Sequence, residues 1–250
     1  MKHFFIFAVA LGLLFALAPH VPTLAQDSIS YGDTVKGSLT SSVTTVSYTF
    51  EAKRGDIAVV QLIAAAANGA IGATLKVSDD NGAVLADSSA LLVFGRLGEI
   101  VVVEARNDGQ YTISVDSGRG GATGDFDVVL LKAEFLEPNK PVEGTASSTP
   151  DGQRGRYTNF YVVESRNETQ LLYERLSGNY APAVIVLGVE AGNNLFERIF
   201  MGGSLLTKGS ITLEGSRDFR LVTVGTLGFG SSGRGAAQTA NFRLILGGMN

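Results

Sequence analysis

Alternating apolar and polar positions run through most of the chain after residue 26, and helical spacing is nearly absent. Val46–Phe50 alternates, and Ile57–Ile63 is β-branched and mostly apolar, so both are typical of strands. Asn81-Gly82 indicates a hairpin because both residues tolerate positive φ. The same pattern predicts further strands at Ala73–Val77, Val84–Ala86, Glu99–Glu104, Tyr111–Val115 and Phe126–Leu131. We therefore predict an all-β chain.

The second half of the chain repeats these features in the same order. The clearest matches pair Val35–Ser38 with Val142–Thr145, Tyr48–Phe50 with Phe160–Val162, and Phe126–Leu130 with Phe242–Leu246. A repeated order of strand-like segments is typical of a duplicated domain.

The repeat and the strand spacing together predict two tandem antiparallel jelly-roll β-sandwich domains. The expected boundaries are residues 26–132 for the first domain and 142–250 for the second. Residues 133–141 contain two prolines and are expected to be a linker that permits some relative motion.

The N-terminus has a different pattern. Lys2 and His3 precede Phe4–Ala18, an uncharged apolar run, and Thr23–Ala25 ends in a small residue. This arrangement is typical of a signal peptide, and the run is shorter than the roughly 20 residues that a membrane span needs. We predict that residues 1–25 are cleaved near Ala25 and that the protein is secreted, to the periplasm or beyond.

Composition removes many chemistries. The chain has no Cys and no Trp, and its two His residues, His3 and His20, both lie in the predicted signal peptide. A mature chain without His or Cys cannot form Ser-His-Asp or Cys-His catalytic groups or His-ligated zinc. The net charge of −4 does not favour nucleic acid as a partner. We therefore expect a non-enzyme and assign no catalytic or cofactor-binding residue.

Acidic loop residues leave two alternatives open. Asp79, Asp80, Asn81 and Asp87 could supply oxygen ligands to calcium, although Asp at a hairpin is ordinarily a turn former. Asp125 and Asp127 form a second cluster, and alternation predicts that both point to solvent while Phe126 points inward. Converging carboxylates could also act as a glycosidase pair.

Aromatic residues gather in the second half and allow two interpretations. They could form a sugar-binding or polymer-binding surface, or they could pack in the core. Adjacent aromatics on a strand point to opposite faces, so one member of a pair could be exposed. The residues concerned are Tyr157, Phe160, Tyr161, Tyr173 and Tyr180.

The first half resembles the bacterial pre-peptidase C-terminal domain over about residues 28–132. The segments that carry this resemblance are Tyr31–Leu39, Val46–Asp56, Val77–Gly82, Gly109–Val115 and Thr123–Val128. The second half diverges, with Asn167-Glu168 in place of Gly55-Asp56. The resemblance implies a secreted, non-catalytic β-sandwich with a role in binding, secretion or folding.

The sequence as a whole favours an exported binding or structural module at the cell envelope or outside the cell. Its partner would be an extracellular protein or a polysaccharide surface, and its oligomeric state is open. The alternatives are a carboxylate-only extracellular hydrolase and a calcium-stabilised carbohydrate-binding or polymer-binding module.

Overall fold

A computed structural model describes residues 27–64, 72–88, 99–147, 159–164, 168–178, 183–190, 193–201, 207–214, 219–225 and 239–248. These residues form strands joined by turns, with no α-helix among them, which confirms the predicted fold class. The predicted signal peptide, residues 1–25, lies outside the described residues. No helix in the described part of the chain is long and apolar enough to cross a membrane.

The first half contains strands β1 to β9. In chain order they are β1 (Asp27–Ser28), β2 (Thr34–Leu39), β3 (Thr45–Ala52), β4 (Ile57–Ala64), β5 (Thr74–Ser78), β6 (Val84–Asp87), β7 (Glu99–Glu104), β8 (Gly109–Asp116) and β9 (Gly124–Lys132). Every strand that the alternating pattern predicted in this half is present.

The second half contains strands β10 to β18. They are β10 (Glu134–Phe135), β11 (Val142–Ser147), β12 (Asn159–Val163), β13 (Thr169–Gly178), β14 (Ala183–Glu190), β15 (Asn193–Met201), β16 (Lys208–Leu213), β17 (Phe219–Gly225) and β18 (Thr239–Gly248).

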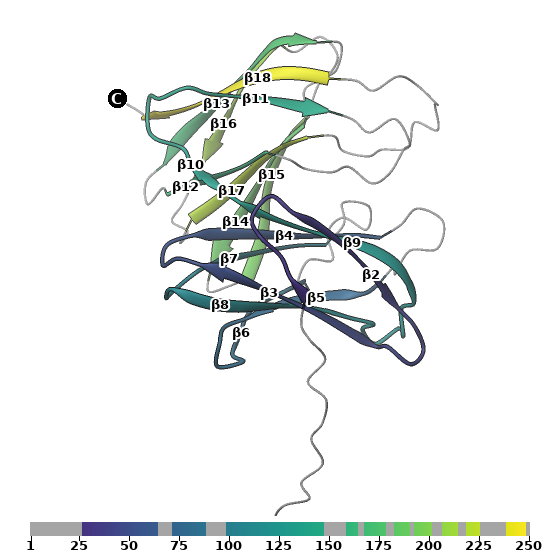
Figure 1. Cartoon of the computed structure of the whole chain (residues 1–250). Coiled ribbons are helices and arrows are strands. Elements are labelled where there is room, and N and C mark those ends of the chain that lie inside the picture. Colours follow the sequence, from purple (N-terminus) through teal and green to yellow (C-terminus); the bar gives the residue numbers. More distant parts are fainter. Residues whose placement is uncertain are drawn as a thin grey trace, which may run out of the picture.

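Each half folds into two sheets. In the first half, sheet I has the order β1-β3-β8-β5-β6 and sheet II the order β2-β9-β4-β7. In the second half, sheet III has the order β10-β12-β17-β14-β15 and sheet IV the order β11-β18-β13-β16. Apart from the short β1 and β10, which pair in parallel, the order is that of two antiparallel jelly rolls. Strand order is the same in the two halves (Figure 1).

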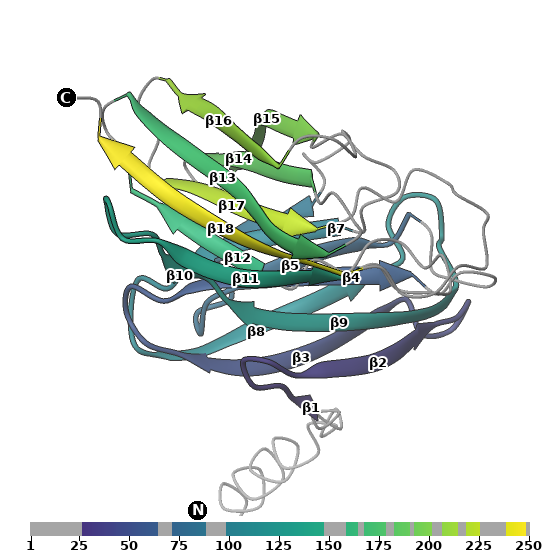
Figure 2. The same cartoon turned by 90° about the horizontal axis from the view of Figure 1, so that it is seen from above.

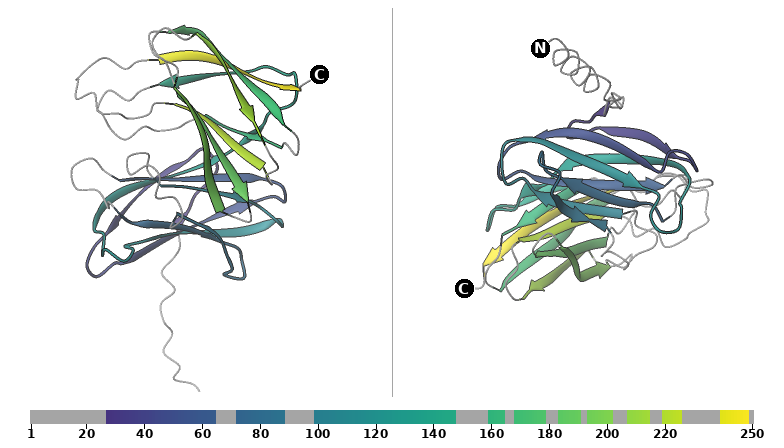
Figure 3. Two further views of the ribbon diagram at one scale, coloured as in Figure 1. Left: turned by 180° about the vertical axis from the view of Figure 1, so that it is seen from behind. Right: turned by 90° about the horizontal axis from the view of Figure 1, so that it is seen from below.

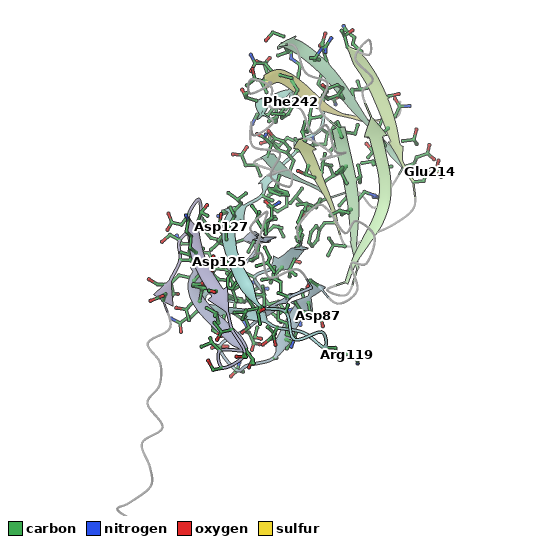
Figure 4. All side chains as sticks on the ribbon, turned by 90° about the vertical axis from the view of Figure 1, so that its right-hand side faces the viewer. Asp87, Arg119, Asp125, Asp127, Glu214 and Phe242 are labelled. Atoms are coloured by element: carbon green, nitrogen blue, oxygen red, sulfur yellow. The ribbon has the colours of Figure 1, made fainter. Side chains whose placement is uncertain are left out.

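Each sandwich encloses its own apolar core. In the first, alternate residues of β3 and β8, such as Tyr48 and Ile113, point toward β4 and β9, which contribute Val60 and Leu130. The second core contains the corresponding side chains of sheets III and IV, among them Phe242. Figure 4 shows Phe242 inside the second sandwich.

A glycine on the first long strand makes room for two aromatic rings in each core. A Cβ on Gly37 would collide with the Phe126 ring and the Tyr48 hydroxyl. A Cβ on Gly144 would lie 2.6 Å from Phe242 and 3.0 Å from the Tyr161 hydroxyl. The two halves therefore share a packing detail that depends on the absence of a side chain.

A third apolar cluster joins the two sandwiches. It combines the outer face of sheet II with the outer face of sheet III, so the molecule is a stack of four sheets (Figures 1 and 3). Its members are Ile57, Val59, Ile100, Val102, Ala133, Phe160, Val162, Ile185, Leu187, Val189, Phe219 and Leu221.

The segment expected to be a linker takes part in this packing. Ala133 is buried in the third cluster, and Glu134–Phe135 forms β10, which pairs with β12. Leu136 is buried in the core of the second sandwich. Residues 133–136 of the expected linker therefore pack against the contact between the sandwiches and against the second sandwich.

The internal match of sheets I and III needs a correction of one residue. Tyr48 faces Ile113 across sheet I, and Tyr161 faces Val222 across sheet III, with all four side chains in the inner cores. Tyr48 therefore corresponds to Tyr161, whereas the sequence match to Phe160 was wrong. The reason is that both faces of β12 are buried, so its sequence does not alternate.

Candidate functional surfaces

The outer face of sheet I is rich in hydroxyl groups. Because the inner positions of β3, β5 and β8 are apolar, the alternate positions point away from the core. We define the hydroxyl face as the outward Thr and Ser residues of these three strands that are not buried, namely Thr45, Ser47, Thr74, Ser78, Thr112 and Ser114; Thr49 lies on the same side but is buried.

Neighbouring polar groups on the hydroxyl face are tied to one another. Thr45 Oγ1 donates to Asp116 Oδ1 at 2.7 Å, and Lys76 Nζ donates to Asp116 Oδ2 at 3.0 Å. The Ser47 and Ser114 hydroxyls lie 3.2 Å apart. These bonds hold the side chains in fixed positions across the sheet. The side chains would therefore lose less conformational entropy when a ligand binds.

The outer face of sheet IV carries a row of alternating charges. Glu143, Arg243, Glu174 and Lys208 stand directly opposite one another on the four neighbouring strands β11, β18, β13 and β16. Arg243 Nη2 lies 2.6 Å from Glu143 Oε1, and Lys208 Nζ lies 2.8 Å from Glu174 Oε1. We call this row the charge ladder; Figure 2 shows β18 between β11 and β13.

The charge ladder shifts the pKa values of its members in the direction expected of ion pairs. The hydrogen bond from Lys208 lowers the pKa of Glu174, and the charges of Lys208 and Arg243 add to this effect. The hydrogen bond to Glu143 raises the pKa of Arg243. Both shifts favour the charged forms, whereas a general acid needs a raised carboxyl pKa.

The proposed calcium residues do not come together as one cluster. Asp79 Oδ1 accepts the backbone N–H of Asn81 at 3.0 Å and of Ala83 at 2.8 Å, and Asp80 Oδ1 accepts from the Asn81 amide at 2.8 Å. Asp87 lies away from this turn, opposite Lys76 on β5. Among the described residues, no group of three or more acidic, His or Cys side chains is placed to hold a metal ion. The geometry is that of an Asx turn.

The second acidic cluster lies on β9, apart from Asp87 (Figure 4). Phe126 is buried in the first core, while Asp125 is exposed and Asp127 is half-buried. Asp127 faces Lys36 on the neighbouring strand β2. The alternation predicted for this strand is confirmed.

The aromatic residues considered for a binding surface are mostly core residues. Phe160 is buried between the sandwiches, and Tyr161 and Tyr173 are buried in the second core. Tyr157 and Tyr180 lie outside the described residues. The interpretation of Phe160, Tyr161 and Tyr173 as an exposed platform was therefore wrong, because the stacking of the sandwiches covers Phe160 and the other two side chains lie in the second core.

The Gly55-Asp56 turn of the first half has a structural role. Asp56 Oδ1 lies 2.6 Å from Lys132 Nζ, and Asp56 Oδ2 accepts the backbone N–H of Lys53 at 3.2 Å. Burial alone would raise the pKa of Asp56, but the bonds and charges of Lys132 and Lys53 outweigh burial and lower it. Lys132 also lies 5.9 Å from the centre of the Tyr31 ring.

Comparisons with known proteins find likeness in structure but not in sequence. No family model matches the chain, and no curated protein sequence matches it. The pre-peptidase C-terminal domain of a Bacillus anthracis collagenase matches with a TM-score of 0.35 at 19% identity, covering 42% of this chain and 93% of that domain.

Two further solved structures are similar at the same low level. The Aeromonas hydrophila protein PliG, a periplasmic inhibitor of g-type lysozyme, has a TM-score of 0.28 at 16% identity, covering 42% of this chain and 99% of its own. The tandem CBM51 modules of a family 98 glycoside hydrolase from Streptococcus pneumoniae have a TM-score of 0.26 at 11% identity, covering 85% and 83%. These likenesses concern the fold alone.

Proposed function

We propose that this chain is an exported, non-catalytic binding module that acts at the cell envelope or outside the cell. The observation that carries the proposal is the hydroxyl face, a broad polar surface on a sandwich that is braced from behind by a second one. The absence of His and Cys after residue 25 supports a binding role over a catalytic one.

The hydroxyl face suits an uncharged, hydroxyl-rich polymer. Neighbouring strands lie about 4.8 Å apart, and outward residues on one strand repeat at about 6.6 Å, so the hydroxyls form a regular grid. Each Ser or Thr hydroxyl can donate one hydrogen bond and accept two, as sugar hydroxyls do. Affinity would come from many modest hydrogen bonds rather than from aromatic stacking.

We further propose that the two halves are copies of one domain, with the first sandwich at 26–132 and the second completed by 142–250. Their identical strand order and the glycine–tyrosine–phenylalanine contact at Gly37 and Gly144 support this. The signal peptide at 1–25 is part of the same proposal, and N-terminal sequencing of the secreted protein should begin at Gln26.

The test is co-sedimentation of the chain without residues 1–25 with two insoluble, uncharged polymers, an α-glucan and a β-glucan. We expect the chain to pellet with at least one of them and Ser114→Arg to reduce pelleting, because Ser114 lies between Ser47 and Lys76 on the hydroxyl face. Ser210→Arg on the outer face of sheet IV is the matched control and should pellet normally.

Two results would contradict the proposal. If both variants pellet equally, the hydroxyl face is not the binding site. If the parent chain pellets with neither polymer, an uncharged polymer is not its ligand. Release of soluble sugar by the parent chain would instead support the carboxylate-only hydrolase.

A further inference from the structure

The contact between the two sandwiches joins unlike faces. Sheet I has the strand order of sheet III, and sheet II has that of sheet IV. The buried contact is made by the outer faces of sheets II and III. One sandwich therefore uses one side of the jelly roll and the other sandwich uses the opposite side.

A head-to-tail contact of this kind does not close on itself. The two faces left free, on sheets I and IV, are the same two types that made the contact. A further sandwich could in principle be added at either end by repeating the same geometry, as a filament grows. The side chains of the free faces must therefore prevent the addition of further sandwiches.

On sheet I, the residues equivalent to the buried contact are polar. Strand pairing aligns the sheets, because Tyr48 opposite Ile113 corresponds to Tyr161 opposite Val222. The neighbouring outward positions then correspond one by one. Phe160, Val162, Leu221, Ile185 and Leu187 of sheet III are replaced on sheet I by Ser47, Thr49, Thr112, Lys76 and Ser78.

On sheet IV the same replacement is found. Val60 opposite Leu130 in sheet II corresponds to Leu171 opposite Leu246 in sheet IV. The interface residues Val59, Ile100 and Val102 then correspond to Gln170, Ser210 and Thr212.

The charge ladder strengthens the polar character of sheet IV. Ile63 of sheet II corresponds to Glu174, a member of the ladder. One position shows the opposite change, since the apolar Leu172 stands where sheet II has the polar Gln61, and Ile245 keeps the apolar character of Val129. These two side chains lie in the row next to the ladder, so covering them would also desolvate its charges, which is costly.

We propose that the chain is a head-to-tail stack of two sandwiches that is capped at both ends. Polar residues stand at the contact positions of both free faces, so neither free face binds a second copy of this chain. Only the outward residues of sheets I and IV provide this cap, because the inner faces of all four sheets remain apolar. This inference concerns assembly and does not depend on the polymer proposed as ligand.

The test restores the contact residues. Variant P carries Gln170→Val, Ser210→Ile and Thr212→Val on sheet IV, and variant Q carries Ser47→Phe, Thr49→Val and Thr112→Leu on sheet I. Masses are measured by light scattering for the parent chain without residues 1–25, for each variant, for their mixture, and for a chain carrying both sets.

We expect the parent chain to be monomeric at every concentration reached, because both faces are capped. The mixture of P and Q should show an about twofold rise in mass, since each partner has one uncapped face, and the chain carrying both sets should form longer assemblies. Thr34→Val with Ser38→Val is the matched control; these exposed β2 residues lie outside the contact, so this variant should stay monomeric.

Two outcomes would overturn the proposal. The first is a parent chain that self-associates and is dissociated by Ser114→Arg or Ser210→Arg, because its free faces would then be contacts. The second is a P and Q mixture that stays monomeric while circular dichroism shows both variants folded. If the variants fail to fold, the mass of the parent chain alone tests the proposal, because a chain with both free faces capped is expected to be monomeric.

Discussion

At the scale of single residues, two glycines determine how closely a strand approaches a core. Gly37 and Gly144 lie opposite Phe126 and Phe242 in their ladders, and the ring occupies the space where a Cβ would be. A tyrosine hydroxyl closes the same space from the facing sheet; in the first sandwich Tyr48 donates to Lys36 O at 3.3 Å. Backbone conformation does not explain these glycines, whereas packing does.

Gly37→Ala and Gly144→Ala should each lower the free energy of unfolding by about 1–3 kcal/mol, the usual cost of overpacking a core. The added methyl group would have to displace an aromatic ring that is fully enclosed. Urea unfolding at neutral pH measures the loss. Ser38→Ala, one residue from Gly37 but exposed, is the control and should change stability little. An unchanged midpoint for both glycine variants would contradict the packing role.

Asp79 should act as a turn residue. Asp79→Ala removes the acceptor of two backbone N–H groups and should cost about 1 kcal/mol in urea unfolding. Asp80→Ala, whose carboxylate accepts only from the exposed Asn81 side chain among the bonds found, should cost less. Calcium should leave the unfolding midpoint of the parent chain unchanged, because a ligand that binds only the folded state would raise it. A rise that Asp79→Ala abolishes would restore the calcium site.

At the scale of elements, the strands are of two kinds. Strands β5 and β8 alternate in burial because one face meets the core and the other meets solvent, and the sequence of β3 alternates in the same way although its outward Thr49 is buried. Strands β4, β12 and β14 are apolar on both faces because the second face lies in the contact between the sandwiches. The run Ile57–Ile63 therefore carried a signal for burial on both sides, which the alternating pattern around it obscured.

The Asp56–Lys132 pair connects the β3–β4 turn to the end of β9, and its contribution should depend on pH. The folded-state pKa of Asp56 is lowered, so the pair stabilises the fold above the unfolded value of about 3.9 and this contribution is lost as the pH falls through the folded pKa. Asp56→Asn should be less stable than the parent chain at about pH 7, and the gap should narrow by about pH 3. Thermal unfolding across this range measures it.

Lys132→Gln removes the partner instead of the carboxylate and should reproduce the narrowing gap. If either variant keeps a constant deficit from neutral to acidic pH, the pair contributes through packing and not through its charge.

At the scale of the whole molecule, the contact between sheets II and III should couple the two sandwiches. Twelve buried side chains among the described residues form this cluster, so separating the sandwiches would expose apolar surface to water. The parent chain should unfold in one calorimetric transition. Val59→Lys places an unpaired charge in the contact and should separate unfolding into two transitions, because each sandwich keeps its own core.

Val35→Lys is the comparison, since Val35 packs at the edge of the first core and not in the contact. It should destabilise the first sandwich directly. Two transitions already present in the parent chain would show that the contact does not couple the sandwiches.

The alternation of residues by itself determined the all-β class, the positions of the main strands in the first half, and the inner face wherever the other face meets water. Phe126 between Asp125 and Asp127 is an example. It also placed the Asn81-Gly82 hairpin, although it could not tell a calcium ligand from a turn former, because the same carboxylate serves both.

Only the tertiary structure decided which residues of sheet III face the core and which face the other sandwich. Alternation shows which side chains point inward only when one face of the strand is apolar and the other polar. In β12 and β14 both faces are buried and apolar, so the sequence does not show which residues point to the core. For that reason the sequence matched Tyr48 to Phe160 instead of Tyr161, and it suggested an exposed aromatic surface where the sandwiches meet. The stacking of unlike faces follows from long-range contact between two folded bodies, which no local pattern encodes.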